Sequence, residues 1–416
     1  MLALACVVAS GCSPRYVLRA GYEEAKILWR REPIERVLAH ADLEPAVRHK
    51  LETVLAARRF AAKLELRVGG SFASLSYVDG DSTVHVLTAA KRTALEPYTW
   101  WFPIVGRVPY KGFFVRAHAE AEATALEARG YDTTIRSAAT FSTLGWFDDP
   151  LLRHLLRHDE GFLVNLVLHE VYHNTFYLGG AHATAFNESL ATFVGHRGAI
   201  TFFAAEPASG DLAHRAEAEW EDARRFGAFI ERLAVRLRQA YAVAPDESAA
   251  LAARAEIFAA ARGELASLPF ETEEFSYSLA EPLNNAVLLH HLLYASGLDL
   301  FEEIYHEQGD LRRTLSFVER AARAVPADPF TAVRRALAAV SPGSRPPAPS
   351  GAAVDAVGVP ARCRSGLEIR QVAQRHTAAE CPQPGRADGD GREPEHNRGA
   401  LDATHWRRRH AVPEEA

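Results

Sequence analysis

The spacing of hydrophobic positions divides the chain into a mixed first part and a helical second part. Apolar side chains recur every three or four positions over residues 16–66, which predicts helices. Stretches rich in β-branched and aromatic residues at 83–88 and 98–105 then predict strands. An Ala- and Glu-rich segment at 115–129 predicts another helix, and a further strand is expected at 140–146. The first part is therefore expected to combine helices with a small sheet.

Helical spacing continues almost without interruption beyond Pro150. Helices are expected at 161–178, 185–198, 211–241, 247–268, 279–296 and 300–324. A sheet region followed by a run of helices predicts an α+β fold that is mostly α. We therefore divide the folded chain into a helical and small-sheet part at 13–150 and a helical part at 151–340.

The character of the sequence changes at Ser341. The last 76 residues contain 9 of the 22 Pro and neither Phe nor Tyr. Such a segment cannot bury enough apolar surface to offset the entropy lost on ordering. Residues 341–416 are therefore expected to form a disordered tail.

The first residues carry a candidate targeting signal. Residues 1–11 form a short apolar run, MLALACVVASG, that ends in small residues directly before Cys12. This pattern is typical of a bacterial lipoprotein signal, in which 1–12 contains the lipobox and Cys12 becomes the lipidated first residue. Ser13 favours the periplasmic face of the outer membrane in the cell envelope. A mildly hydrophobic terminus without a targeting role is the alternative interpretation.

Composition and charge exclude several classes of protein. The 416 residues are 48% hydrophobic and 24% charged, as in globular proteins, and no run approaches the ~18 apolar residues of a membrane-spanning helix. The formal net charge of −6 offers no positive surface for nucleic acid, which is not expected as a partner. No Cys lies between Cys12 and Cys363, so a Cys-based metal site is not expected in the folded part.

One motif in the helix expected at 161–178 carries candidate chemistry. The segment His169-Glu170-Val171-Tyr172-His173 places two His residues one helical turn apart, so both imidazoles can reach one metal ion. Glu170 lies beside them, where its carboxylate can accept a proton from water at the metal. The neighbouring side chains are uncharged, which is typical of a buried active-site helix. A core helix with two structural His residues is the competing interpretation.

A catalytic Zn²⁺ needs a third protein ligand and one open position. Glu188 follows His173 by fifteen residues, on the helix expected at 185–198. Gly179–Gly180 permit a tight turn, so this helix can return beside the first. His182, in the intervening loop, is the alternative ligand. Because the HExxHxxGxxH spacing is not met, we favour Glu188.

Six blocks of sequence together resemble one known family. They are the lipobox, the HExxH motif, PYKGFF at 109–114, STLGWFD at 142–148, FNESLATFV at 186–194 and LNNA at 283–286. With these blocks the chain resembles the bacterial zinc aminopeptidase lipoproteins of the gluzincin type over most of residues 12–325. The resemblance implies a zincin-like fold, Zn²⁺ bound by His169, His173 and Glu188, and Glu170 as general base.

Other residues are candidates for contact with a peptide substrate. They are Ser142, Thr143, Leu144, Gly145, Asn284, Asn285, Tyr277 and Tyr294. The first four could form the edge strand on which zincins bind an extended peptide, although an ordinary strand is an equal alternative. One Asn could cap a helix while the other orients substrate, and capping alone is favoured. The Tyr residues could donate a hydrogen bond to an oxyanion, or simply belong to the core.

The sequence thus predicts a zinc-dependent peptidase, expected to be an aminopeptidase, that acts on peptides and is held to the membrane by its N-terminal lipid. The alternative is a non-catalytic envelope lipoprotein that keeps a zincin-like fold as a scaffold or binding protein. Glu170 favours the enzyme, because a purely structural metal site has no use for a base. The GxMEN exopeptidase motif is absent, so the choice between exo- and endo-cleavage stays open.

Overall fold

The computed structural model describes residues 22, 25–77, 84–102, 106–138, 148–205, 209–273, 275 and 282–340, which all belong to one unit of the chain. The signal at 1–12 with Cys12, the candidate strand at 142–145, Tyr277 and the tail at 341–416 lie outside the described residues. Among the described residues, no helix has the length and apolar character needed to cross a membrane.

A small sheet lies beside the N-terminal helices. Its strands are β1 (Arg31–Pro33), β2 (Ser74–Ser76) and β8 (Leu151–Leu152), in the order β1-β2-β8, and α3 (Ile34–Leu38) and α4 (Pro45–Lys63) connect the first two. The pairing of β1 with β2 is antiparallel and that of β2 with β8 is parallel. Strand β8 leads directly into the helical half, so this sheet ties the two parts of the fold together.

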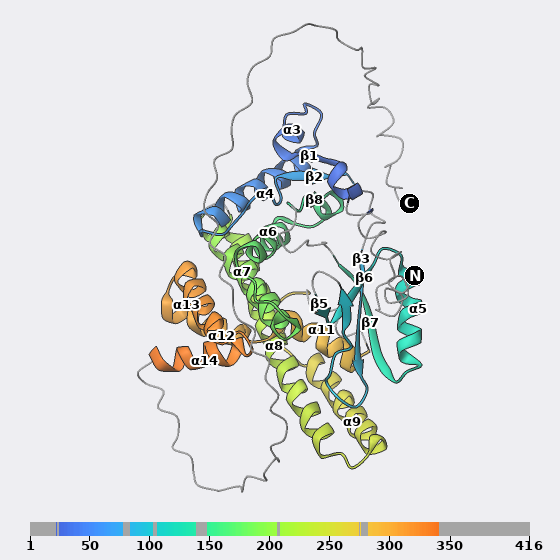
Figure 1. Ribbon diagram of the computed structural model, residues 1–416. Coiled ribbons are helices and arrows are strands. Elements are labelled where there is room, and N and C mark those ends of the chain that lie inside the picture. The colour runs from blue at the N-terminus through green and yellow to red at the C-terminus, as the bar shows by residue number, and fades with distance from the viewer. Residues whose placement is uncertain are drawn as a thin grey trace, which may run out of the picture. The chain divides into compact units, whose positions relative to one another are not determined.

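A larger antiparallel sheet has helices on both faces. It contains β3 (Val84–Lys91), β6 (Tyr110–Phe113) and β7 (Tyr131–Ala138) in the order β6-β3-β7, and β4 (Trp100–Phe102) and β5 (Gly106–Val108) form a separate hairpin. Leu87 and Ala89 of β3 pack in a cluster with α5 (Arg116–Glu127). The opposite face of β3 lies towards α11 (Asn285–Ala295), as Figure 1 shows.

Strands β6 and β7 were not predicted from the hydrophobic pattern. β7 reads YDTTIRSA, a largely polar run without the apolar alternation expected of a half-buried strand. It becomes a strand because it pairs with β3 over its full length, from Val84 opposite Ala138 to Lys91 opposite Tyr131. Tertiary pairing, rather than local preference, determines this element.

The helical half confirms the expected α+β, mostly helical fold. Its elements are η1 (Arg153–Arg157), α6 (Glu160–Thr175), η2 (Ala181–Ala183), α7 (Thr184–Ala204), α8 (Gly210–Val243), α9 (Glu247–Ala266), α11, α12 (Leu298–Gln308), α13 (Leu311–Ala324) and α14 (Pro329–Val340). Several boundaries differ from the prediction, since α7 continues to Ala204 rather than ending at residue 198, and α6 ends at Thr175 rather than at residue 178. The helix expected at 300–324 is two helices, because Gly309 adopts a left-handed conformation (φ +66°) and Asp310 caps the next helix. Helix α11 begins only at Asn285.

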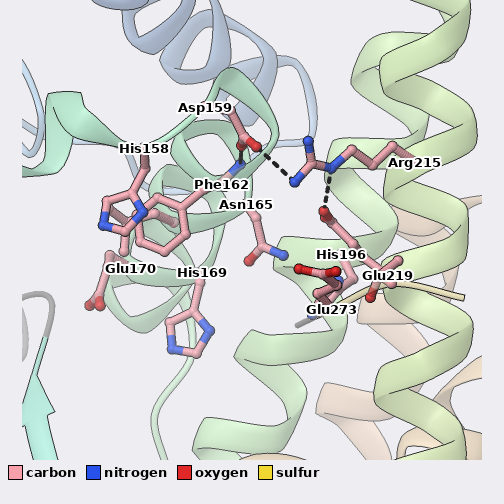
Figure 2. A pocket seen from close by; sticks show the side chains of 12 residues that line it. His158, Asp159, Phe162, Asn165, His169, Glu170, His196, Arg215, Glu219 and Glu273 are labelled. Carbon is pink, nitrogen blue, oxygen red and sulfur yellow. Dashed lines mark hydrogen bonds and ion pairs between the residues drawn. The ribbon is translucent and has the colours of Figure 1, made fainter. Parts of the chain in front are cut away.

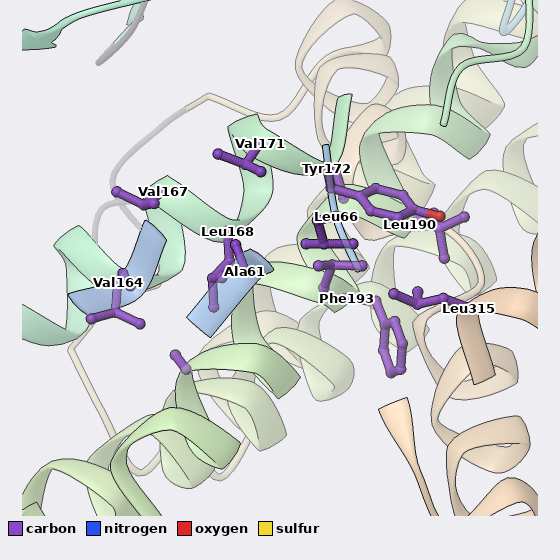
Figure 3. Packing of buried hydrophobic residues seen from close by; sticks show 14 of the residues in the cluster. Ala61, Leu66, Val164, Val167, Leu168, Val171, Tyr172, Leu190, Phe193 and Leu315 are labelled. Atoms are coloured by element: carbon purple, nitrogen blue, oxygen red, sulfur yellow. The ribbon is translucent and has the colours of Figure 1, made fainter. Parts of the chain in front are cut away.

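The largest hydrophobic core surrounds α6 and α7 (Figure 3). Val167, Leu168, Val171 and Tyr172 of α6 are completely buried. Each apolar side chain of this size contributes about 1.5–3 kcal/mol when it is fully buried. The packed face therefore holds α6 firmly, and its remaining side chains are presented from a rigid support.

Two glycines of α7 allow it to approach α6 closely. A Cβ atom at Gly195 would collide with Oδ1 of Asn165, and one at Gly198 would lie 2.5 Å from Cδ1 of Leu168. A side chain at either position would have to displace Asn165 or Leu168 of α6. This close crossing is what permits side chains of α6 and α7 to meet.

Candidate metal centre

Helix α6 presents the HExxH residues from a capped and buried framework. The Asp159 side chain accepts a hydrogen bond from the backbone N–H of Phe162 (2.9 Å) and so begins the helix. The core packing of α6 leaves His169 and His173 together on one face, with Glu170 next to them. His173 is 7% exposed.

Three side chains from two adjacent helices converge at this point. The Nε2 atoms of His169 and His173 lie 3.3 Å apart. Oε2 of Glu188, from α7, lies 3.5 Å from each of them. Among the described residues, these three form the group of His, Cys, Asp and Glu side chains that could hold a metal ion.

Asn187, directly before Glu188, positions this part of α7. Its buried side chain accepts a hydrogen bond from the backbone N–H of Leu178 (3.0 Å) and donates one to the carbonyl of the same residue (2.8 Å). Ser189, on the other side, donates to the carbonyl of Leu293 in α11 (3.0 Å). The residues on both sides of Glu188 are therefore held by hydrogen bonds to neighbouring segments.

The spacing of the three ligand atoms fits a tetrahedral cation. Bonds of 2.0–2.2 Å from Zn²⁺ to nitrogen and oxygen, at tetrahedral angles, place ligand atoms roughly 3.4 Å apart. The separations here are 3.3 and 3.5 Å. Neutral imidazole and carboxylate are also the ligands that zinc accepts. The residues present therefore fit such an ion in ligand type and in spacing.

The electrostatics of the group also favour a cation. Burial opposes a charge on His173, yet the adjacent Glu188 carboxylate outweighs it and raises the pKa of His173 to about 9. Burial opposes the charge of Glu188 as well, but the two imidazoles hold the pKa of that carboxyl well below its usual value. Glu188 thus remains ionised, and a positive charge beside it is stabilised.

His182 does not join this group. It is exposed, and its ring lies over Gly180, where an added Cβ would come within 2.6 Å of the imidazole. Gly180 has a φ of +97°, which provides the turn between α6 and α7. Of the two candidate third ligands, the structure brings Glu188 to the paired His residues.

A cavity of about 490 Å³ adjoins the centre (Figure 2). His169 and Glu170 line it from α6, and His196 lines it from α7. His196 is 8% exposed, and burial, with the nearby charges of His169 and Arg197, lowers its pKa to about 4. It lies two helical turns beyond Glu188 on the same face of α7, a spacing that could have revealed it in the sequence.

Two tyrosines lie near the candidate metal ligands. Burial, then the negative charge of Glu188 and more weakly that of Glu170, raises the pKa of both Tyr110 and Tyr294. Tyr294, from α11, has its ring centroid 6.4 Å from that of His169. Tyr110 begins strand β6 at the edge of the described sheet, and it belongs to the PYKGFF block of the sequence, although no role at the centre was predicted for it.

Asn284 and Asn285 make structural contacts. The Asn284 side chain caps α11 by accepting a hydrogen bond from Val287 N–H (2.9 Å). Asn285 is completely buried, donates to the carbonyl of Lys91 (2.8 Å) and accepts from the Tyr241 hydroxyl (2.9 Å). These contacts hold α11 against the larger sheet. The substrate contact expected of the pair stays a prediction, as do those of Tyr277 and residues 142–145.

The fold and this centre together define an α+β protein, mostly helical, with a possible His-His-Glu metal site. The family model described as "Putative aminopeptidase" matches residues 15–330, and the chain belongs to this aminopeptidase-like family. Membership supports a peptidase at a coarse level. The comparisons with the curated proteins and with the solved structures gave no match.

Proposed function

We propose that the protein is a zinc-dependent peptidase with a zincin-like active site. The observation that carries this proposal is the convergence of His169, His173 and Glu188 to within 3.5 Å of one another. A cavity that also contains Glu170 opens beside them. Three ligands with adjacent open space are the arrangement of a catalytic zinc site, whereas structural sites are closed by four protein ligands.

In this proposal, His169, His173 and Glu188 hold Zn²⁺. When bound, the ion supplies a Lewis acid that polarises the peptide carbonyl and makes water more acidic. Glu170 accepts the proton from the attacking water and delivers it to the leaving amine. The hydroxyl of Tyr110 or Tyr294 donates a hydrogen bond to the oxyanion, because both phenols lie near the two carboxylates and remain protonated at neutral pH.

Aminopeptidase activity is the form of this proposal that the family description supports. An aminopeptidase must exclude substrates whose N-terminus is blocked. A free-amine peptide and its acetylated counterpart therefore distinguish aminopeptidase from endopeptidase activity of the same centre.

We expect the purified protein to contain about one zinc per chain, and to lose peptide hydrolysis when the metal is removed. A Lewis acid contributes several kcal/mol to the transition state, so chelation should lower kcat/KM by about a hundredfold or more. Metal content by mass spectrometry and hydrolysis of a peptide library before chelation, after chelation and after return of Zn²⁺ measure this. Hydrolysis that is unaffected by chelation would contradict the proposal, and a zinc-loaded protein that cleaves nothing would favour the scaffold alternative.

We further propose that the enzyme is anchored by lipid at Cys12 in the bacterial envelope, on the periplasmic face of the outer membrane. The support is the apolar run and lipobox of residues 1–12. We expect Cys12→Ala to release the protein from membranes into the soluble fraction, whereas Cys6→Ala, in the same run, should leave it bound. Metabolic labelling with a fatty acid and membrane fractionation test this, and equal labelling of the Cys12→Ala protein would refute it.

A further inference from the structure

The cavity beside the metal centre is lined by more negative than positive charge. Apart from Glu170, its carboxylates are Asp159, Glu219 and Glu273, and its cation is Arg215. Arg215 forms ion pairs with two of these carboxylates. Its Nη2 lies 3.0 Å from Oδ2 of Asp159, and its Nε lies 2.9 Å from Oε1 of Glu219. Figure 2 shows this pairing, with Glu219, Glu273 and His196 gathered on the side of α7 and α8. The one arginine of the described lining is therefore paired with two of these three carboxylates, and Glu273 is left without a cation among the described residues.

Two polar side chains in the cavity have no hydrogen-bond or ion-pair partner within the part of the chain that the structure describes. No hydrogen bond or ion pair engages Glu273, nor His196, although the His196 side chain is more than nine-tenths buried. A buried polar group normally has a hydrogen-bond partner, and one that lines a cavity without a protein partner indicates a ligand. This argument applies to His196, whereas Glu273 is exposed and its carboxylate, at the cavity wall, is free of partners among the residues described.

The segment that carries Glu273 is firmly anchored. Asp222, which is completely buried in α8, accepts hydrogen bonds from the backbone N–H groups of Glu271 (2.9 Å) and Thr272 (2.7 Å). It also accepts one from the Thr272 hydroxyl (2.9 Å). Glu273, which lines the cavity, therefore directly follows a segment held by several hydrogen bonds.

The environment of Glu219 also favours a cation. Burial raises the pKa of the Glu219 carboxyl, and Asp159 and Asp222 add to this, although Arg215 opposes them. A second positive group nearby would stabilise the charged carboxylate.

The shape of the cavity suits a long side chain. Phe162 and Leu166 supply an apolar wall, and Phe162 precedes the metal ligand His169 by seven residues, which is about 10 Å along the helix axis. The volume of about 490 Å³ lies within the range of about 300–1,000 Å³ found for ligand pockets. A lysine or arginine side chain combines an apolar stem with a charged end. It therefore matches the apolar wall and the carboxylates of the cavity.

On the basis of the proposed peptidase function, we infer that this cavity is a specificity pocket for a lysine or arginine side chain next to the scissile bond. The stem lies against Phe162 and Leu166, and Glu219 and Glu273 receive the cationic group. The free α-amine of a peptide offers the same charge, but it has no stem to fill the apolar part of the cavity.

The test uses the full-length protein and peptides that differ at one position on either side of the scissile bond. Lysine, arginine and norleucine are compared, each with a free and an acetylated N-terminus. We expect kcat/KM to be about tenfold or more higher for lysine than for norleucine, because these two side chains share the four-carbon stem and differ only in the cation. Arginine, with a shorter stem and the same charge, should also be preferred over norleucine. The Glu219→Gln/Glu273→Gln variant should bring the ratio close to one, and Glu273→Gln alone should lower it. Glu256→Gln, an exposed site on α9 outside the cavity, is the matched control and should leave the ratio unchanged.

Equal cleavage of the lysine and norleucine peptides would overturn the pocket while leaving the peptidase intact. So would a preference that follows the free N-terminus whatever the side chain. If no peptide is cleaved, calorimetry with N-acetyl-lysine amide and N-acetyl-norleucine amide decides. Tighter binding of the lysine compound that is lost in the double variant supports the pocket even though the peptidase fails, and equal binding refutes it.

Discussion

Replacing Glu170 by Gln is expected to abolish peptide hydrolysis while the protein keeps its metal. The substitution preserves the size of the side chain and removes only the group that accepts a proton. A positioned general base contributes about 10²–10⁴-fold to the rate, so kcat should fall by that order. His169, His173 and Glu188 are untouched, so zinc content measured by mass spectrometry should stay at the wild-type level.

The chain offers a matched control on the same helix. Glu160 occupies the first turn of α6 and is not a metal ligand, so Glu160→Gln makes the same chemical change away from the centre. We expect this variant to retain most of the activity. Turnover by Glu170→Gln at a rate near that of Glu160→Gln would remove the general-base assignment. Loss of zinc from Glu170→Gln would instead show that Glu170 helps to hold the metal.

The parts of the centre that could be predicted from the sequence are those set by local geometry. His169 and His173 meet because residues four apart share a helix face, and this holds wherever the helix lies. Glu188 required one further step, a turn at Gly179–Gly180 between two successive helices. These residues are close in the sequence, so few alternative arrangements compete.

The parts that were missed depend on contacts between distant segments. Tyr110 reaches the centre from the edge of a sheet, and Glu219 reaches the cavity from α8. Glu273 is placed there by a loop that hydrogen-bonds to Asp222. Nothing in the spacing around Glu219 or Glu273 distinguishes them from exposed polar positions, and Tyr110 was noted only as a member of the PYKGFF block.

The same distinction holds for the fold. Long amphipathic helices such as α8 and α9 were predicted with nearly correct ends, since their buried faces repeat with the helical period. Strand β7 was missed because its residues are polar, and because β3 provides all of its observed pairing. The division between the sheet part and the helical part was predicted at residue 150, yet Asn285 of α11 hydrogen-bonds directly to β3. That division therefore separates elements that pack together.

Replacing Glu188 by Ala is expected to weaken metal binding and activity together. Changes to residues that only support metal ligands cost about 10–100-fold in affinity, so loss of a ligand should cost about a hundredfold or more. The two imidazoles would also lose the carboxylate that now lies 3.5 Å from each. Zinc affinity measured by competition with a chromogenic chelator, alongside kcat/KM at saturating zinc, tests both effects.

His182→Ala is the control that separates the two candidate third ligands. His182 is exposed and its ring lies over Gly180, so its removal should leave zinc affinity and kcat/KM unchanged. If His182→Ala lost zinc while Glu188→Ala kept it, the third ligand would come from the loop, and the arrangement of α6 and α7 would have to change when metal binds. If neither variant lost zinc, the third ligand that holds the ion beside His169 and His173 would be some other group. The expected pattern follows from helix packing: α7 crosses close to α6 at Gly195 and Gly198, and Oε2 of Glu188 lies 3.5 Å from Nε2 of both His169 and His173.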